Sequence, residues 1–223
     1  MDGILLVDKP RAFTSHDVVD IIRRRFGFKK VGHAGTLDPI ATGLLVILIG
    51  SYTKRSSEFL NHDKEYEATM TLGATSDTQD AWGKITPCVS KGINAADVEG
   101  VFKKFSGPME QDVPAFSAKK INGKKSYELA RKGIEVKLQP QKIVIHSMNV
   151  TRIDLPRVSF SVRCSKGTYV RQICSDIGSA LGCGAYMSEL RRTSSGSFRI
   201  EDAVGVDKLK EMAGTDLEKY LKL

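Results

Sequence analysis

The most constraining feature of this sequence is a glycine-rich segment that runs directly into an uninterrupted apolar stretch. Residues 31–43 contain one carboxylate, Asp38, and residues 44–49 are all apolar. Loops are normally solvated, but this one joins a stretch apolar enough to form core, so we expect Asp38 to be held near the core. Burial raises the pKa of a carboxyl group, so Asp38 would stay ionised only with a cationic partner or several N–H donors. For an isolated Leu-Asp-Pro sequence, a turn or a helix N-cap is the simpler interpretation.

The composition is that of an ordinary globular protein. With 223 residues, 41% of them hydrophobic and 27% charged, the chain can form one large domain or two small ones with a proper core. The longest apolar run is far too short to cross a bilayer and no signal peptide is visible, so we expect a cytoplasmic protein with no membrane partner. The cysteines and histidines lack the spacing of metal ligands, so we expect no metal site.

The charge of the chain favours an acidic partner. Its formal net charge is +8, which solubility alone could explain, but the cations are clustered. The clusters are Arg23-Arg24-Arg25 with Lys29-Lys30, Lys119-Lys120, Lys124-Lys125, Arg131-Lys132 and Arg191-Arg192. Several separate basic patches on one domain of this size favour a polyanion, and nucleic acid is the first candidate.

Hydrophobic periodicity predicts strands and helices that alternate without a regular βαβ repeat. Thr14-x-x-Asp17 and Asn94-x-x-Asp97 are typical of helix N-termini, and Gly27 would end the first helix. Residues 66–72 alternate between apolar and polar, which predicts a half-buried strand. Further predictions are strands at residues 3–7, 143–153 and 158–164, a hairpin at Asn122-Gly123, a helix at residues 126–132 and a helix capped by Thr168. The pattern favours an α+β domain on a mixed, mainly antiparallel sheet.

Seven motifs, in order along the chain, resemble those of the TruB-type tRNA pseudouridine synthases. The string Gly-His-Ala-Gly-Thr-Leu-Asp-Pro-Ile-Ala-Thr-Gly at residues 32–43 is similar to the active-site motif of that family. The other motifs are Leu6-Val7-Asp8-Lys9-Pro10, Tyr66 with Leu72-Gly73, Asp77-Thr78-Gln79-Asp80-Ala81-Trp82-Gly83, Phe116-Ser117-Ala118-Lys119 with Tyr127 and Ala130-Arg131, Lys166-Gly167-Thr168-Tyr169-Val170-Arg171, and Leu190-Arg191-Arg192. They span about residues 4 to 200, and on them the chain is identified as a member of this family. Residues 50–54 and 113–118 depart from the family pattern, which leaves details of the RNA contact open.

The resemblance implies the pseudouridine-synthase fold, with a bent, mixed, mainly antiparallel sheet flanked by helices. We expect a single catalytic domain over residues 1–223, with an insertion at about residues 110–138 that grips RNA. Many members carry a further C-terminal RNA-binding domain of the PUA type. This sequence ends after a short amphipathic tail at residues 206–223, so we expect that domain to be missing.

The resemblance also implies a reaction without cofactor or metal, in which a uridine becomes pseudouridine. Asp38 matches the family's nucleophile, and Arg171 matches the Arg of the Lys-Gly-Thr-Tyr-x-Arg motif. Arg171 would lie in the first turn of a helix, where the helix dipole disfavours a cation, and pairing with Asp38 would compensate for this. Tyr66 is the third catalytic candidate, since the family's Tyr stacks on the flipped base and is a candidate to accept the proton of carbon 5.

The substrate-binding candidates come from the same resemblance. They are His33, Tyr169, Leu190, Lys9, Lys119, Lys124 and Lys125. From pattern alone, Tyr66, Tyr169 and Leu190 would be core residues, His33 a structural residue and Arg171 a surface residue without a partner. Lys9-Pro10 would alternatively do no more than shape the loop that braces Asp38.

These expectations combine into one leading hypothesis, a cytoplasmic, monomeric pseudouridine synthase that acts on the T arm of tRNA. The first alternative is an RNA-binding or tRNA-folding module whose catalysis is dispensable. The second is a synthase that depends on a guide RNA and partner proteins, which the expected lack of a PUA-type domain disfavours. The intact set of Asp38, Tyr66 and Arg171 argues against the first alternative.

Overall fold

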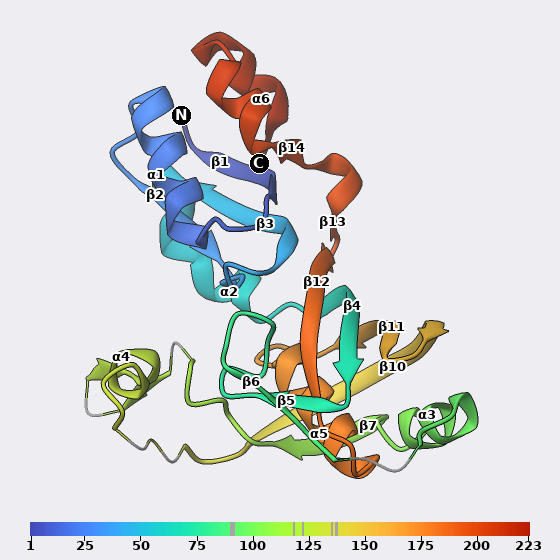
Figure 1. The fold of residues 1–223 in the computed structure, drawn as a ribbon. Helices are drawn as coiled ribbons and strands as arrows, with labels where there is room; N and C mark the ends of the chain where they lie inside the picture. The colour runs from blue at the N-terminus through green and yellow to red at the C-terminus, as the bar shows by residue number, and fades with distance from the viewer. Residues whose placement is uncertain (90–91, 118, 122, 135, 137) are drawn as a thin grey trace. The chain divides into compact units, whose positions relative to one another are not determined.

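A computed structural model describes the chain except for residues 90, 91, 118, 122, 135 and 137 (Figure 1). For residues 120, 121 and 125 it describes the backbone alone. The chain folds into two compact units: residues 1–67 with 190–223 form the first, and residues 68–189 form the second. Two strands, β4 (Lys64–Leu72) and β12 (Ala185–Ser195), run from one unit into the other.

The first unit is built around strand β3 (Thr42–Ile49), which contains the apolar stretch. One edge of β3 pairs antiparallel with β1 (Gly3–Lys9), and every residue of β1 takes part in this pairing. The other edge pairs antiparallel with β2 (Val31–Ala34) and, further along, parallel with β12 at Arg191 and Arg192. The short strands β14 (Val204–Gly205) and β15 (Leu221–Lys222) pair with β1, and β13 (Phe198–Arg199) pairs with β12. β3 is therefore a central strand of a mixed sheet.

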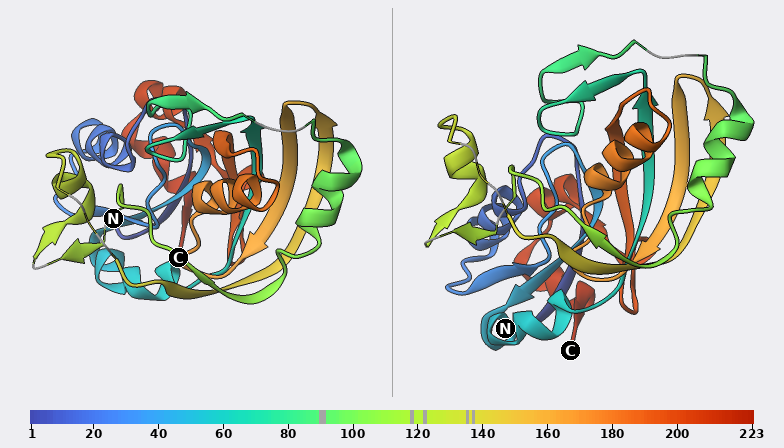
Figure 2. Two further views of the ribbon diagram at one scale, coloured as in Figure 1. Left: turned by 60° about the horizontal axis from the view of Figure 1, so that its bottom comes forward. Right: turned by 90° about the horizontal axis from the view of Figure 1, so that it is seen from below.

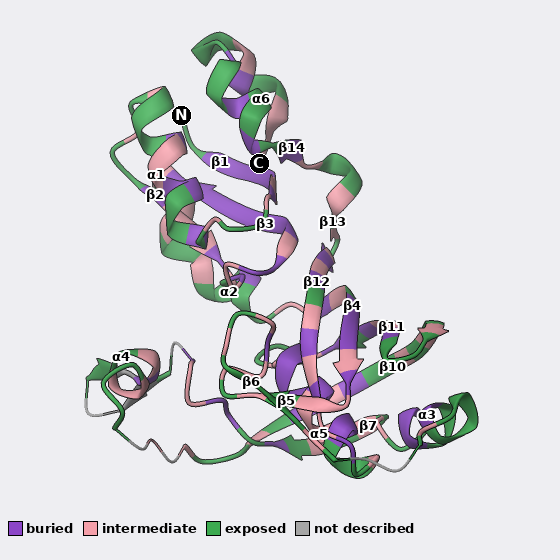
Figure 3. Cartoon of the chain, viewed as in Figure 1, coloured by how far each residue is buried: buried purple, intermediate pink, exposed green. Residues whose placement is uncertain are grey.

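Both faces of β3 are covered, which explains why its apolar residues are consecutive. Leu45, Ile47 and Ile49 pack in one cluster with helices α1 (Ser15–Phe26) and α6 (Val206–Glu211). Leu44, Val46 and Leu48 pack on the opposite face with Phe59 of α2 (Ser56–Leu60). All six side chains are fully buried, so the prediction of core is confirmed (Figure 3). The remaining helices of this unit are short 3-10 turns, η1 (Gly50–Arg55), η2 (Ile200–Asp202) and η3 (Gly214–Tyr220).

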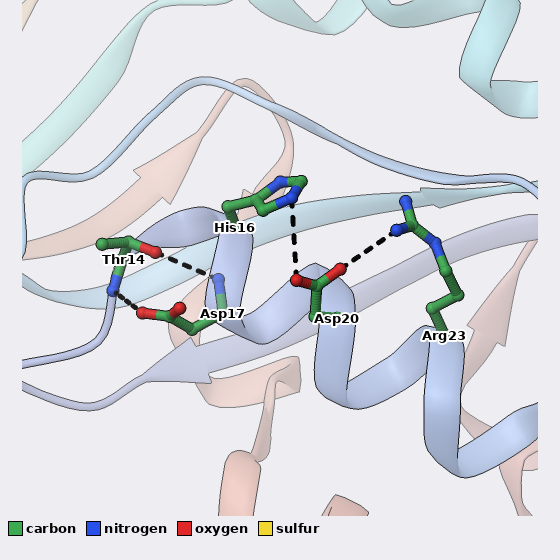
Figure 4. Close-up of polar contacts among 5 residues, drawn as sticks. All are labelled: Thr14, His16, Asp17, Asp20 and Arg23. Carbon is green, nitrogen blue, oxygen red and sulfur yellow. Dashed lines mark hydrogen bonds and ion pairs between the residues drawn. The ribbon is translucent and has the colours of Figure 1, made fainter.

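Helix α1 begins and ends where the sequence predicts. The Thr14 hydroxyl accepts from the backbone N–H of Asp17 at 3.0 Å, and the Asp17 carboxylate accepts from the backbone N–H of Thr14 at 2.7 Å (Figure 4). One turn further on, Asp20 lies 3.0 Å from Arg23 and 3.7 Å from His16 (Figure 4). Gly27 ends the helix in a left-handed conformation with φ of 69°. The capping box fixes the start of α1, and with it the position of Ser15, the first residue of the helix, which is buried.

The second unit contains a sheet with the strand order β12-β4-β11-β10-β7. Its long strands are β10 (Gln141–Asp154) and β11 (Arg157–Cys164), and β7 (Gly107–Gln111) pairs antiparallel with β10. Helices α3 (Ala95–Phe102) and α5 (Val170–Ala180) lie beside these strands (Figure 2). Phe102 of α3 meets Phe160 of β11 edge-to-face. The other elements are β5 (Ala74–Ser76) paired with β6 (Ile85–Pro87), β8 (Lys120–Ile121) paired with β9 (Lys124–Lys125), and α4 (Ser126–Ala130).

Most predicted elements of the second unit are confirmed, with two corrections. The hairpin between β8 and β9 forms as predicted, although Asn122 lies outside the described residues. Thr168 does not cap α5: its hydroxyl donates to the carbonyl of Ser165, and the N-cap position belongs to Tyr169, whose side chain makes no capping bond. Helix α4 ends at Ala130, two residues earlier than predicted. Across the described residues, no helix is both long and apolar enough to span a membrane.

Candidate active site

The loop that carries Asp38 is held by its backbone on both sides of the carboxylate. On one side, the Ser15 hydroxyl accepts from the N–H of Leu37 at 2.9 Å and donates to the carbonyl of the same residue at 3.2 Å. On the other side, the N–H of Ala12 donates to the carbonyl of Pro39 at 2.9 Å. Leu37 is buried, and Asp38 itself is half-buried. As expected, the carboxylate is held beside the core.

A buried guanidinium joins the two ends of this loop. Arg192 of β12 is 1% exposed, and its Nε donates to the carbonyl of Leu44 at 2.7 Å while its Nη2 donates to the carbonyl of Gly35 at 3.0 Å. At Gly43 the backbone has φ of 99°, and a Cβ atom there would overlap the backbone of Arg192. Arg192 therefore does not belong to a basic surface patch. The expectation that Arg191-Arg192 form one is wrong for Arg192, because strand alternation turns its side chain inward.

Lys9 is a second buried cation beside the same loop. Its ammonium group donates to the carbonyls of Pro10 at 3.0 Å and Phe13 at 2.7 Å. The pKa of Lys9 is lowered to about 8 in all: burial lowers it most, the carboxylate of Asp38 raises it in part, and the charge of Arg192 adds to the lowering. Lys9 therefore lies within electrostatic range of both Asp38 and Arg192. The contacts of Lys9 are those of a residue that shapes residues 10–13, and its role in substrate binding stays a prediction.

Three further candidates of the first unit lie on its strands. His33 of β2 is half-buried, and its Nδ1 atom is buried with no hydrogen-bond partner among the described residues. Burial, and then the charges of Arg192 and His16, lower the pKa of His33, so its imidazole is neutral at pH 7. Tyr66 is half-buried on β4, and Leu190 on β12 is 9% exposed. A neutral imidazole can donate and accept hydrogen bonds, which suits contact with RNA.

In the second unit, the segment from Gly167 to Arg171 is held by neutral amides. The Gln111 side chain accepts from the N–H of Tyr169 at 2.8 Å and donates to its carbonyl at 3.1 Å. Gln141 donates to the carbonyl of Gly167. Arg171 follows in the first turn of α5, as expected, and its guanidinium lies 5.4 Å from the ring centroid of Tyr169.

Arg171 is 4% exposed, and its Nη2 donates to the carbonyl of Phe116 at 2.6 Å. The alternative of an unpaired surface Arg is therefore wrong. Asp38 and Arg171 belong to different units, so their pairing stays a prediction.

The predicted RNA-gripping insertion presents exposed cations. Lys119 and Lys124 are exposed, whereas the side chain of Lys125 lies outside the described part of the chain. The hairpin of β8 and β9 leads into α4, where the Ser126 hydroxyl donates to the carbonyl of Ala115. This hydrogen bond joins two segments of the insertion, while Lys119 and Lys124 face solvent.

Sequence reasoning missed three residues that support these segments: Ser15, Gln111 and Arg192. Two of them had a usable signal. Ser15 follows directly on the capping residue Thr14, and Arg192 is two positions from apolar Leu190 on a strand, so the two share a face. Gln111 had none, because its partner Tyr169 is 58 residues away along the chain.

Comparison with known proteins agrees with this geometry. Residues 23–170 match the TruB family pseudouridylate synthase (N terminal domain), and residues 171–222 match the tRNA pseudouridylate synthase B C-terminal domain. The chain is 45% identical to tRNA pseudouridine synthase B of Opitutus terrae, over 99% of this chain and 92% of that protein. It is 46% identical to tRNA pseudouridine synthase B of Syntrophotalea carbinolica, over 99% of this chain and 72% of the relative.

Among solved structures, the crystal structure of a Cbf5-Nop10-Gar1 complex matches with a TM-score of 0.76 and 30% identity. That match covers 99% of this chain and 57% of the other, so this chain spans little more than half of that protein's length. The motifs, the mixed sheet flanked by helices and these matches agree, and the chain belongs to the TruB family of pseudouridylate synthases.

Proposed function

We propose that this protein isomerises a uridine in the T arm of tRNA to pseudouridine. The observation that carries the proposal is the half-buried Asp38, held beside the core within the family's active-site motif. The curated relatives are named tRNA pseudouridine synthase B, which supports tRNA as the substrate. We further propose that the protein acts in the cytoplasm as a monomer.

The chemistry divides into three steps that side chains of this chain can serve. The bond from sugar carbon 1′ to base nitrogen 1 breaks, the base turns, and carbon 5 bonds to carbon 1′. Carbon 5 gives up its proton and nitrogen 1 gains one, so the product is an isomer and nothing is oxidised. Asp38 serves as the nucleophile that helps to detach the base, and Tyr66 as the acceptor of the carbon-5 proton. Arg171 is the candidate cationic partner of Asp38.

The RNA would be held by the residues that the family resemblance assigns to substrate binding. A uridine in a folded arm must leave its stack before a carboxylate can reach its sugar, which costs a few kcal/mol. His33, Tyr169 and Leu190 would receive the flipped base. The exposed Lys119 and Lys124 of the insertion, with Lys125, would contact the phosphate backbone.

The experiment that tests this function uses the purified chain on a bare T-arm stem-loop under single-turnover conditions. Wild type should form pseudouridine at one mapped position without added cofactor, guide RNA or partner protein. Binding without product would instead indicate an RNA-binding or tRNA-folding module. Product that appears only after addition of a guide RNA and partner proteins would indicate the guide-dependent class.

A further inference from the structure

We infer that Ser15 and Arg192 are positioning residues that hold the Asp38 loop, and through it the carboxylate, in the geometry the reaction needs. The inference rests on the proposed function, because it assigns these residues to the same site. Neither side chain needs to touch the substrate: each acts on the loop backbone. They come from distant parts of the sequence, and both bind the backbone of the Asp38 loop within the first unit.

The contacts of Arg192 are distributed so that they close the loop. Its guanidinium donates to the carbonyls of Gly35 and Leu44, which precede and follow Asp38 in the sequence. A charged group in a protein interior is a poor means of gaining stability, because apolar residues of similar size often do as well. The buried guanidinium of Arg192 binds both ends of one loop, so its function is better explained by the conformation that it imposes on that loop.

Glycines make this contact possible. Gly35 has φ of 92°, and a Cβ atom at Gly35 would lie 3.3 Å from Nη1 of Arg192. At Gly43, a side chain would overlap the backbone of Arg192. The glycines of the motif therefore allow the backbone to approach Arg192, in addition to the turns that they permit.

Ser15 fixes the residue immediately before the nucleophile. Its hydroxyl makes two hydrogen bonds with the backbone of Leu37, one as acceptor and one as donor. Ser15 is 2% exposed and is the first residue of α1, whose start is set by the capping box of Thr14 and Asp17. Helix α1 therefore fixes the Asp38 loop through a single buried hydroxyl.

For catalysis, the fixed loop would keep the carboxylate of Asp38 at the right distance from the sugar carbon. Reacting atoms must meet at near-attack distance, and a misplacement of about 1 Å can reduce the rate by about 100-fold. With backbone hydrogen bonds at Gly35, Leu37 and Leu44, and at Pro39 from Ala12, the Asp38 backbone has little freedom to move. Loss of either positioning residue should then slow the chemical step more than it weakens RNA binding.

The test compares Ser15→Ala and Arg192→Lys with two matched controls. Ser179→Ala removes an exposed hydroxyl that donates within α5, and Arg199→Lys changes an exposed Arg that donates to the carbonyl of Gly196. On a T-arm stem-loop, kcat should fall about 100-fold in Ser15→Ala and Arg192→Lys, with KM within about threefold of wild type. The controls should keep wild-type kcat.

Amide hydrogen exchange of residues 35–41 provides a readout that needs no activity. Exchange should accelerate in Ser15→Ala and Arg192→Lys but not in the controls. If Arg192→Lys does not fold, Ser15→Ala decides alone. Unchanged exchange in the folded variants, or faster exchange with kcat within about threefold of wild type, would overturn the inference. A wild type that binds the stem-loop but forms no pseudouridine would refute the proposed function instead, and exchange would still decide whether the loop is held as we infer.

Discussion

The carbonyls of Gly35 and Leu44, on either side of Asp38, are bound by the charged guanidinium of Arg192. The carbonyls of Gly167 and Tyr169 are instead bound by the neutral amides of Gln141 and Gln111. Both sets of donors are attached to regular elements of their own unit, and both hold a segment that contains a candidate catalytic residue. The donors differ in charge, and so do the candidate catalytic residues of the two segments, Asp38 and Arg171.

A carboxylate and a guanidinium need opposite surroundings. Nearby cations favour the ionised form of a carboxyl group, so buried cations beside the Asp38 loop support both the backbone and the charge of the nucleophile. A further cation beside Arg171 would instead repel it. Gln111 and Gln141 fix the backbone of the Arg171 segment without adding a charge. The type of buried donor thus matches the charge that each segment carries.

The largest effect should come from the one acidic residue on which this comparison depends. Asp38→Asn keeps the size of the side chain but removes the nucleophile, so single-turnover conversion should fall by about 10⁴-fold or more, on the order seen when catalytic residues are removed elsewhere. RNA affinity should change little, because phosphate contacts dominate it. Appreciable pseudouridine formation by Asp38→Asn would exclude Asp38 as the nucleophile.

The next effect concerns the guanidinium of the second unit. Arg171→Lys keeps the charge but loses the forked geometry, so we expect a rate loss of about 100-fold. Arg171→Ala removes the guanidinium altogether and should lose more activity than Arg171→Lys. A wild-type single-turnover rate in either variant would show that Arg171 does not take part in the reaction.

Replacement of the amide donors tests whether they hold the Tyr169 segment. Gln111→Met removes two buried hydrogen bonds of Tyr169 and should lower the free energy of unfolding by about 2 kcal/mol. Gln141→Met removes one hydrogen bond at a half-buried position and should cost less than about 1 kcal/mol. Chemical denaturation of the two variants measures the difference. Equal losses of stability in the two variants would mean that the two hydrogen bonds of Gln111 stabilise the fold no more than the single bond of Gln141.

The same comparison shows which parts of the site could be predicted. The capping box of α1 and the closeness of the Asp38 segment to the core are encoded locally, and both are confirmed. Arg192 was misassigned because cations were grouped by their closeness in sequence, while the alternation of a strand sends neighbours to opposite faces.

The amide contacts of the second unit depend on tertiary structure. Gln111 lies at the end of β7 and meets Tyr169 only because β7 and the start of α5 come together in the folded unit. Thr168 has the residue type of a cap, but the hydroxyl is engaged by Ser165 one turn earlier. Local propensity thus predicted the charged segment well and the amide-held segment poorly.

A smaller effect should separate the two kinds of donor by pH. Lys9 has a pKa of about 8 in the folded state against an ordinary value near 10.5, so the unfolded chain binds more protons above pH 8. Stability contributed by Lys9 should therefore rise with pH from about 8, by about 1 kcal/mol between pH 8 and 9, and be lost as pH falls through 8. Denaturation of wild type beside Lys9→Met over this range measures it. A constant difference between the two proteins would contradict the lowered pKa, and Gln111→Met should show no such trend.

The smallest effect should come from the insertion, where Lys119 and Lys124 face solvent. Lys119→Gln with Lys124→Gln should weaken binding to any T-arm sequence and flatten its salt dependence, by up to about 0.7 log units for each phosphate that is no longer neutralised. The rate at saturating RNA should stay near that of wild type, because the buried donors around Asp38 and Tyr169 are untouched. Lys103→Gln with Lys104→Gln removes two equally exposed charges after α3 and serves as the control. If affinity and salt slope are the same in both double variants, the insertion does not grip RNA, and the charge of the chain acts through its general field rather than through this hairpin.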